Sequence, residues 1–294
     1  MNSLEIAKVN NIREIAFCCI STGEFRFPKD EACRIAIKTV KNYLKENAGY
    51  FDKIVFNVFT DEDYNIYLKN LGEEYNSRIL KTKQMIKNAD YILIGAGAGL
   101  STAAGLEYSG ESFKKNYKEF IERYNFSDLY SASFYPFRKQ EEKWAFWAKL
   151  IKLNRFNSPL KLYKELLELV KGKEYFVITT NVDGQFEIAG FKKKKIFATQ
   201  GDYSLLQCED GCHNRLYNNK EMLEEWLKLT ENCEIPKELV PKCPVCGKNM
   251  EMNLRKDANF VQDENWYKQS KNYEDFLDRT KNKNVVLLEI GVRL

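Results

Sequence analysis

Residues 91–105 read YILIGAGAGLSTAAG, and this stretch indicates the fold of most of the chain. The run YILI is apolar without alternation, which is typical of a strand buried on both faces of a parallel sheet. A glycine-rich turn follows directly, and Ser101 can cap a helix that begins there. The N–H groups of such a turn and the dipole of the helix favour an anion such as a pyrophosphate. The G-x-G-x-G spacing departs from the ordinary dinucleotide fingerprint, so a purely structural tight turn stays open as an alternative.

Apolar runs and helical patterns alternate on both sides of this stretch. The predicted strands are 15–20, 53–59, 91–94, 175–180, 196–199 and 285–292. The predicted helices cover 32–44, a segment after Asp61, 82–90, parts of 111–157, and 158–169. The polar segment 72–83 predicts a linker, and the cysteine-bearing segment 203–255 predicts irregular structure. Strands that alternate with helices predict an α/β fold, a doubly wound parallel sheet with flanking helices.

Composition limits the classes of function. The 294 residues carry a formal net charge of only +4, which argues against nucleic acid as a partner. The N-terminus lacks the apolar core of a signal peptide, and no run approaches the roughly 20 apolar residues of a membrane span. We therefore expect a cytoplasmic protein that does not bind membranes. In that compartment its 8 cysteines are expected to be reduced.

Two pairs of cysteines have the spacing of metal ligands. Cys208 and Cys212 are separated by three residues, Cys243 and Cys246 by two, and CPVCGK has the turn-forming Pro and Gly of a metal knuckle. Four thiolates suit tetrahedral zinc and leave no open position for water, so the expected site is structural. Independent buried thiols are the alternative.

Two further segments complete a resemblance to a known family. TTNVDG at 179–184 follows a predicted strand, and VVLLEIGV occupies 285–292. Together with GAGLSTAAGLEYSG at 97–110, these segments resemble the sirtuin motifs and occur in the family's order. The resemblance covers about residues 82–294. It implies an NAD-binding Rossmann-type domain at 76–294, with a small zinc module at about 203–255.

The departures from the sirtuin pattern bear on the reaction. At the position of the family's catalytic histidine stands Gln200, and the only histidine in the chain, His213, lies beside Cys212. An amide does not titrate near neutral pH and cannot serve as a base. The chain is in this respect similar to the class M sirtuins, which implies an NAD-dependent protein ADP-ribosyltransferase. A protein-lysine deacylase and an inactive truncated NAD- or ADP-ribose-binding fragment are the alternatives.

The resemblance assigns roles to individual residues. Asn181, Asp183 and Gln200 are the expected catalytic residues, with Asn181 holding the ribose as it becomes cationic and Asp183 assisting. Local capping of the Asp-Gly turn is the alternative for Asp183. The implied acceptor is a protein, such as a lipoylated carrier. The residues expected to bind NAD are Gly95, Ala96, Gly97, Ala98, Gly99, Ser101, Thr180, Asn181, Asp183, Gln200, Gly291 and Val292.

The N-terminal segment carries a second resemblance. Residues 19–44, CISTGEFRFPKDEACRIAIKTVKNYL, resemble the second half of a macrodomain, including the Ser21-Thr22-Gly23 loop that wraps a diphosphate in that family. We expect residues 1–75 to form a partial macrodomain, a small α/β fragment with exposed edges and apolar faces. A macrodomain partner on another chain is one way to cover those faces.

Overall fold

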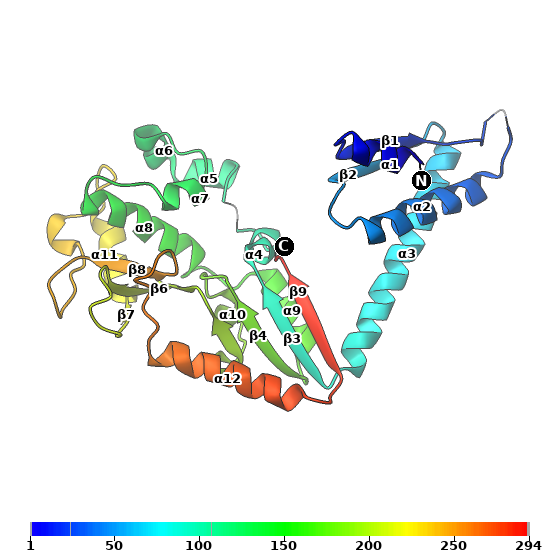
Figure 1. Cartoon of the computed structure of the whole chain (residues 1–294). Helices are drawn as coiled ribbons and strands as arrows, with labels where there is room; N and C mark the ends of the chain where they lie inside the picture. The colour runs from blue at the N-terminus through cyan, green and yellow to red at the C-terminus, as the bar shows by residue number, and fades with distance from the viewer. Residues whose placement is uncertain (1, 24, 107, 293–294) are drawn as a thin grey trace. The chain divides into compact units, whose positions relative to one another are not determined.

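The computed structural model describes residues 2–23, 25–106 and 108–292. The chain divides into two compact units, Met1–Lys87 and Asn88–Leu294. The boundary predicted between residues 75 and 76 falls inside a helix, α3 (Asp61–Asn88). In Figure 1 the first unit is drawn from blue to cyan and the second from cyan to red.

The first unit is a two-stranded parallel sheet with helices. Its elements are α1 (Asn2–Val9), β1 (Glu14–Cys18), α2 (Lys29–Glu46), β2 (Lys53–Asn57) and the first part of α3. Two small clusters form its core, one around Tyr43 and one around Cys33. Large apolar side chains are exposed at the loops, with Phe59 98% and Phe25 86% accessible. The prediction of exposed apolar surface in this fragment agrees with these exposed fractions.

Helix α3 replaces the predicted linker, so that prediction was wrong. Every side chain from 76 to 85 is exposed, and the next, Ile86, is buried. This part of the helix is exposed on all sides, and its apolar side chains, such as Ile79 and Leu80, do not form the buried stripe by which helices are recognised in a sequence. Its residue types, with Lys, Arg, Gln, Leu and Ile, are nevertheless compatible with helix.

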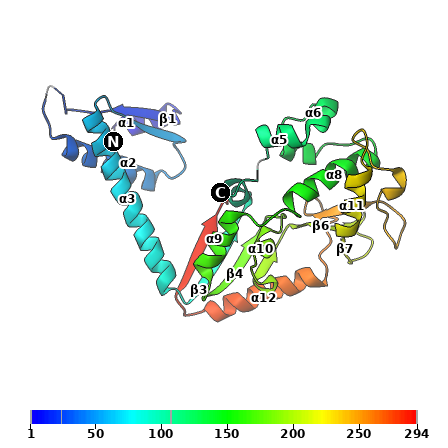
Figure 2. The ribbon, with the colours of Figure 1, turned by 180° about the vertical axis from the view of Figure 1, so that it is seen from behind.

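The second unit is built on a four-stranded parallel sheet in the order β5-β4-β3-β9. Its strands are β3 (Tyr91–Ala96), β4 (Glu174–Thr179), β5 (Ile196–Ala198) and β9 (Val285–Ile290). Helix α12 (Glu264–Thr280) packs on β4 and β5 through Phe276, Phe176 and Phe197. Helix α9 (Lys161–Val170) lies over the side of the sheet turned toward the viewer in Figure 2. The predicted α/β sheet with flanking helices is confirmed.

Helices and a second sheet form the remainder of this unit. The helices are α4 (Ala98–Ala103), α5 (Glu111–Asn116), α6 (Lys118–Tyr124), α7 (Leu129–Ser133), α8 (Gln140–Asn154), α10 (Gln185–Ile188) and α11 (Lys220–Leu229), with short 3-10 turns at Lys193–Lys195 and Lys237–Leu239. The sheet is antiparallel, in the order β7-β6-β8, with β6 (Gly201–Cys208), β7 (Tyr217–Asn218) and β8 (Met250–Leu254). The rings of Trp144 on α8 and Trp226 on α11 pack against each other, tilted by 35°, with centroids 5.0 Å apart.

The segment 203–255 is therefore ordered, and the prediction of irregular structure there was wrong. β6 has eight residues, GDYSLLQC, but they do not alternate apolar with polar, and β7 and β8 have only two and five residues. None of the helices in the described ranges combines the length and the apolar composition that crossing a membrane requires.

Candidate functional site

The glycine-rich turn is held against the end of the last strand. The N–H of Gly97 donates to the carbonyl of Ile290 at 3.1 Å, and the N–H of Gly99 donates to that of Gly291 at 3.0 Å. A Cβ on Gly99 would lie 2.8 Å from the Cα of Gly291, which has a φ of +66°. The glycines are thus required for contact between two backbones. The amides of Gly97 and Gly99 are paired here, so phosphate binding through them requires these bonds to exchange.

The other residues expected to bind NAD lie at the same edge of the sheet. Gly95 and Ala96 end β3, and the carbonyl of Ala96 accepts from the N–H of Thr180 at 3.1 Å. Ala98 begins α4, and Val292 follows β9 with 49% of its surface exposed. Since the carboxyl ends of parallel strands meet at one edge, residues far apart in sequence gather there.

A buried polar cluster connects this turn to the TTNVDG segment. The Nδ2 of Asn181 donates to the carbonyl of Gly97 at 3.0 Å and to the Oγ of Ser101 at 3.2 Å. Ser101 donates in turn to Oδ2 of Asp183 at 2.5 Å. The hydroxyl of Tyr163, from α9, lies 2.7 Å from Oγ of Ser101 and 3.2 Å from Nδ2 of Asn181. The structure therefore brings four predicted site residues together with Tyr163, which the sequence did not indicate.

Asp183 is buried at the end of this cluster, with 3% of its surface exposed. Burial raises the pKa of its carboxyl above the ordinary value, and the hydrogen bonds from Ser101 and the N–H of Gln185 oppose that rise. The following Gly184 has a φ of +66°, and a Cβ there would overlap the guanidinium of Arg155. Asp183 thus both binds Ser101 and closes the turn through the N–H of Gln185 at 2.9 Å. Both interpretations of Asp183 therefore hold, since its carboxyl group caps the Asp-Gly turn and also belongs to the polar cluster.

Gln200 faces a different space. It lines a cavity of about 730 Å³ whose walls include Tyr108, Trp147, Val182 and Tyr203. Asn181 and Asp183 line a separate cavity of about 280 Å³. Val182 stands between these two residues in the sequence and lies in the wall of the larger cavity. The TTNVDG segment therefore borders both cavities.

The larger cavity holds no group that is a good base near neutral pH, among the described residues that line it. Burial alone would raise the pKa of Glu251, but the charges and hydrogen bonds of Lys143 and Lys256, each 2.7 Å away, hold it below its ordinary value. Burial raises the pKa of Tyr108 to about 12 and raises that of Tyr203 as well. Glu251 is therefore a weak base, and the two phenols stay protonated.

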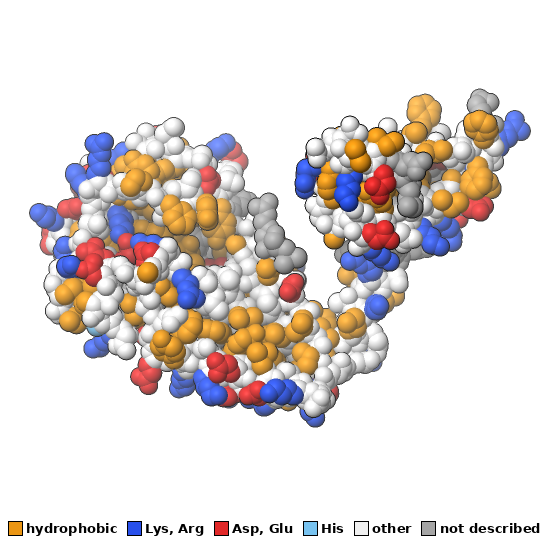
Figure 3. Space-filling view, viewed as in Figure 1, with side chains coloured by type: hydrophobic (Ala, Val, Ile, Leu, Met, Phe, Trp, Pro, Cys, Tyr) orange, Lys and Arg blue, Asp and Glu red, His pale blue; other side chains and the backbone are white. Residues whose placement is uncertain are grey.

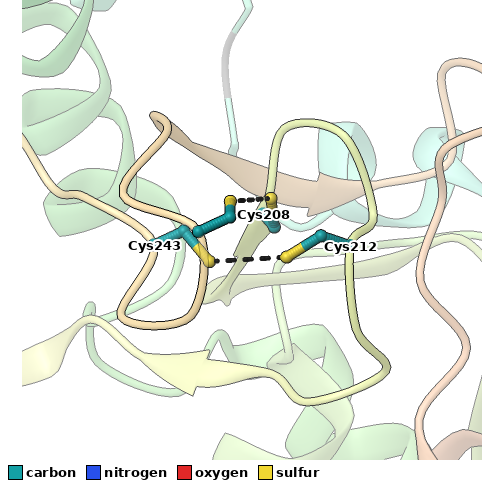
Figure 4. Close-up of side chains that lie close together, drawn as sticks. Cys208, Cys212 and Cys243 are labelled. Atoms are coloured by element: carbon teal, nitrogen blue, oxygen red, sulfur yellow. Dashed lines mark hydrogen bonds between the residues drawn. The ribbon is translucent and has the colours of Figure 1, made fainter.

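The four predicted metal ligands gather at one point. The Sγ atoms of Cys208, Cys212, Cys243 and Cys246 all lie within 4.8 Å of one another (Figure 4). Two of the sulfur–sulfur distances are 3.6 and 3.7 Å. A zinc ion with Zn–S bonds of about 2.3 Å requires tetrahedral edges of about 3.8 Å, so the cluster fits this metal. His213 lies alongside, with Nδ1 3.1 Å from Sγ of Cys212 and Nε2 3.0 Å from the hydroxyl of Tyr217.

Comparison with known families matches this arrangement. The model of the Sir2 family matches residues 97–283, which include the glycine-rich turn, the TTNVDG segment and all four cysteines. The chain belongs to the Sir2 family. A model of the macro domain matches residues 1–36 ahead of the Sir2 domain. The resemblances noted in the sequence are thereby confirmed.

Relatives of this Sir2 protein include enzymes with named activities. It is 39% identical over 220 residues to a protein ADP-ribosyltransferase of Staphylococcus aureus (strain Mu50 / ATCC 700699), covering 72% of this chain and 70% of the relative. It is 32% identical over 305 residues to a probable bifunctional ADP-ribose hydrolase/ADP-ribosyltransferase of Fusarium oxysporum f. sp. cubense. That match covers 95% of this chain and half of the relative's length. A solved Sir2 homologue in complex with 2′-O-acetyl ADP ribose has 18% identity and a TM-score of 0.47, over 70% of this chain and 72% of that one.

Tyr163 is the site residue of this Sir2 domain that sequence reasoning missed. It lies on the buried face of α9 together with Leu166 and Val170, at helical spacing. That pattern indicates a core position, and Tyr163 is fully buried. The one signal in the sequence is a tyrosine on an otherwise aliphatic face, because a buried hydroxyl needs a polar partner. That signal is weak, since it does not say which residue the partner is.

Proposed function

We propose that this Sir2 protein is an NAD-dependent protein ADP-ribosyltransferase, which transfers ADP-ribose from NAD to a protein acceptor and releases nicotinamide. The named activities of the Staphylococcus and Fusarium relatives support the reaction class. The sequence left two alternatives, a lysine deacylase and an inactive fragment. No feature of the site described above favours either of them.

One observation carries the proposal, which is the chemistry of the cavity that Gln200 lines. A deacylating sirtuin uses a histidine there to take a proton from the ribose. Gln200 cannot take that proton, Glu251 is held ionised by two lysines, and the nearby phenols stay protonated. A pocket without a base favours an acceptor that carries no proton to remove.

The acceptor chemistry follows from this. In the transfer, the bond between the ribose carbon and the nicotinamide nitrogen breaks, and the electron pair leaves with nicotinamide. An ionised carboxylate of the acceptor protein can form the new bond to that carbon without any base. We therefore propose an Asp or Glu side chain as the modified group. For Asn181 and Gln200 both to supply oriented dipoles as the ribose becomes cationic, the ribose has to lie at the TTNVDG segment, which borders both cavities.

The larger cavity supports a protein acceptor with an extended arm. Its volume of about 730 Å³ lies within the range of ligand pockets, and seven of the 18 residues in its walls are aromatic. Tyr130 and Phe134, on and after α7, are 69% and 62% exposed at its edge. Hydrophobic side chains gather on this part of the second unit in Figure 3. A lipoylated carrier protein, whose arm is long and largely apolar, fits these walls.

The remaining expectations are proposals of the same kind. The four-cysteine cluster would hold structural Zn²⁺, which ties β6 to the loop before β8, and a reducing cytoplasm would keep its thiols available. The macro-like first unit would be covered by a macrodomain partner. NAD would lie along the carboxyl edge of the parallel sheet, bordered by the residues assigned to it above.

Product analysis tests the function directly. The full chain is incubated with NAD, an acetylated peptide and a lipoylated carrier protein, and all products are weighed by mass spectrometry. We expect ADP-ribosylated carrier and free nicotinamide, with ADP-ribose from water as a slow side product. Deacetylated peptide and acetyl-ADP-ribose at a comparable rate would overturn the proposal. Gln200→Ala serves as the variant that perturbs the cavity and leaves the zinc cluster intact.

A further inference from the structure

Tyr163 occupies the centre of the buried polar cluster. Its hydroxyl lies 2.7 Å from Oγ of Ser101 and 3.2 Å from Nδ2 of Asn181. The three side chains come from α9, α4 and the loop after β4, so the contacts join three separate elements. All three residues are buried, with Tyr163 and Ser101 wholly inaccessible and Asn181 8% exposed.

Donor count fixes the direction of the hydrogen bond between Tyr163 and Ser101. Ser101 has one proton and donates it to Asp183, so its oxygen acts as the acceptor toward Tyr163. Tyr163 must therefore donate to Ser101. Burial raises the pKa of Tyr163, so its hydroxyl keeps this proton. The oxygen of Tyr163 is then free to accept from Nδ2 of Asn181.

This polarity determines how the amide of Asn181 is oriented. Its Nδ2 faces three acceptors, the carbonyl of Gly97 and the oxygens of Ser101 and Tyr163. Among the described residues, no donor bonds to its Oδ1. An amide flip would place Oδ1 against three acceptor oxygens, which is unfavourable. The amide therefore keeps Oδ1 as the atom that can accept a hydrogen bond from a ligand, and Asn181 lines the smaller cavity.

The ordinary alternative is that Tyr163 only fills space. Its ring does pack on Phe186, edge to face, with centroids 4.9 Å apart. That contact accounts for an aromatic ring at this position. It does not account for the hydroxyl, because a phenylalanine would make the same contact equally well. The hydroxyl is the part that touches Ser101 and Asn181.

We infer that Tyr163 is a positioning residue for the transfer reaction, acting through Asn181, whose amide it holds with Oδ1 directed at the ribose of NAD. This inference rests on the proposed function. Tyr163 touches no substrate. Its effect passes through the orientation of Asn181, so removal of its hydroxyl should change the rate of the chemical step more than the binding of NAD.

The test compares Tyr163→Phe, Asn181→Ala and the double variant by release of nicotinamide from NAD. This readout counts each turnover whether ADP-ribose goes to protein or to water. We expect Tyr163→Phe to lower kcat about tenfold with KM for NAD within about twofold. Asn181→Ala should lower kcat by about a hundredfold or more. The double variant should match Asn181→Ala alone, because the hydroxyl has nothing left to orient.

Tyr117→Phe is the matched control, since it also removes a buried tyrosine hydroxyl. The hydroxyl of Tyr117 has no hydrogen-bond partner among the described residues. It should retain wild-type kcat. Thermal unfolding checks that each variant is folded at the assay temperature. Additive losses in the double variant, or a Tyr163→Phe enzyme with wild-type kcat, would overturn the inference alone. A folded wild-type chain that releases no nicotinamide would overturn the proposed function, and the inference with it.

Discussion

The hydroxyl of Ser101 donates to a carboxylate oxygen of Asp183 at 2.5 Å, although 82 residues separate them in the sequence. Ser101 lies on the helix that follows β3, and Asp183 lies in the loop that follows the neighbouring strand β4. The bond therefore joins the helix that follows the glycine-rich turn to the TTNVDG segment. It also places a carboxyl group where burial opposes its ionisation.

Asp183→Asn should raise the free energy of unfolding at neutral pH while it lowers activity. The folded state raises the pKa of Asp183, so the folded state binds its proton more tightly than the unfolded state does. The wild type accordingly loses stability as pH rises from the unfolded pKa of about 4 through the raised folded pKa. In urea titrations from pH 4 to 8, the free energy of unfolding of the variant should rise relative to that of the wild type as the pH increases.

Asp128→Asn provides a control of opposite sign. Asp128 caps α7, and hydrogen bonds from the N–H and the hydroxyl of Ser131 lower the pKa of its carboxyl. Its contribution is present above the unfolded pKa and is lost as pH falls through the folded pKa. This variant should therefore be less stable than wild type at pH 7. A common pH trend for both variants would contradict the assignment.

Asn181→Ala should abolish most of the transfer while the fold and the metal content stay the same. Its proposed contact strengthens as the ribose becomes cationic, so the loss should appear in kcat, by about two orders of magnitude. Steady-state kinetics with NAD, together with circular dichroism and elemental analysis, checks this. Loss of the folded state would show instead that its contacts with Gly97, Ser101 and Tyr163 are structural.

Purified protein should contain about one zinc ion per chain, bound by the four clustered thiolates. Replacing Cys243 with Ala should remove the metal and unfold the antiparallel sheet, since binding and folding are coupled there. Elemental analysis and limited proteolysis measure the two effects. Cys233→Ala, at a buried cysteine outside the cluster, should leave the zinc content unchanged. Well-folded wild-type protein without zinc would contradict the prediction.

Gly99→Ala should destabilise the second unit by about 1–3 kcal/mol, because its Cβ would press on the backbone of Gly291. Gly72→Ala is the matched change in α3, where nothing lies within 4 Å of the added carbon. That substitution should be neutral or stabilise by up to about 1 kcal/mol. Denaturant titration of both variants gives the comparison. Equal effects would contradict the close contact.

The first unit should not bind ADP-ribose measurably. The loop with Ser21 and Thr22 borders a cavity of only about 360 Å³, lined largely by apolar side chains, and supplies part of the contacts such a ligand needs. Calorimetry of ADP-ribose against the full chain and against the double variant Ser21→Ala/Thr22→Ala should give identical curves. Micromolar binding that the double variant loses would refute the prediction.

The sequence predicted those parts of the fold whose physics is local. YILI and VVLLEIGV are long apolar runs and become β3 and β9, and Trp144 lies in the core of a helical region. The cysteine spacings predicted the cluster because metal ligands on tight turns are close in sequence. The middle of helix α3 was predicted as a linker because residues 76–85 are all exposed and form no apolar stripe. Strand β6 was missed because its residues do not alternate apolar with polar, and β8 because it has only five residues.

The site was only partly predictable. Asn181, Asp183 and Gln200 were recognised by family motifs, which do not say that Gln200 faces another cavity. Tyr163 was hidden because its function depends on a contact with Ser101, 62 residues away, that only the tertiary fold creates. The pairing of the Gly97 and Gly99 amides was hidden for the same reason, since its partners belong to the last strand.

The contact of Gly97 and Gly99 with Gly291 affects how mutational scans of this protein should be interpreted. All three positions would reject nearly every side chain, because a Cβ at any of them meets backbone atoms. A scan scored by activity would therefore mark them as essential even if none touched a nucleotide. Intolerance at these glycines measures the closeness of two backbone segments, and it is not evidence of a phosphate contact.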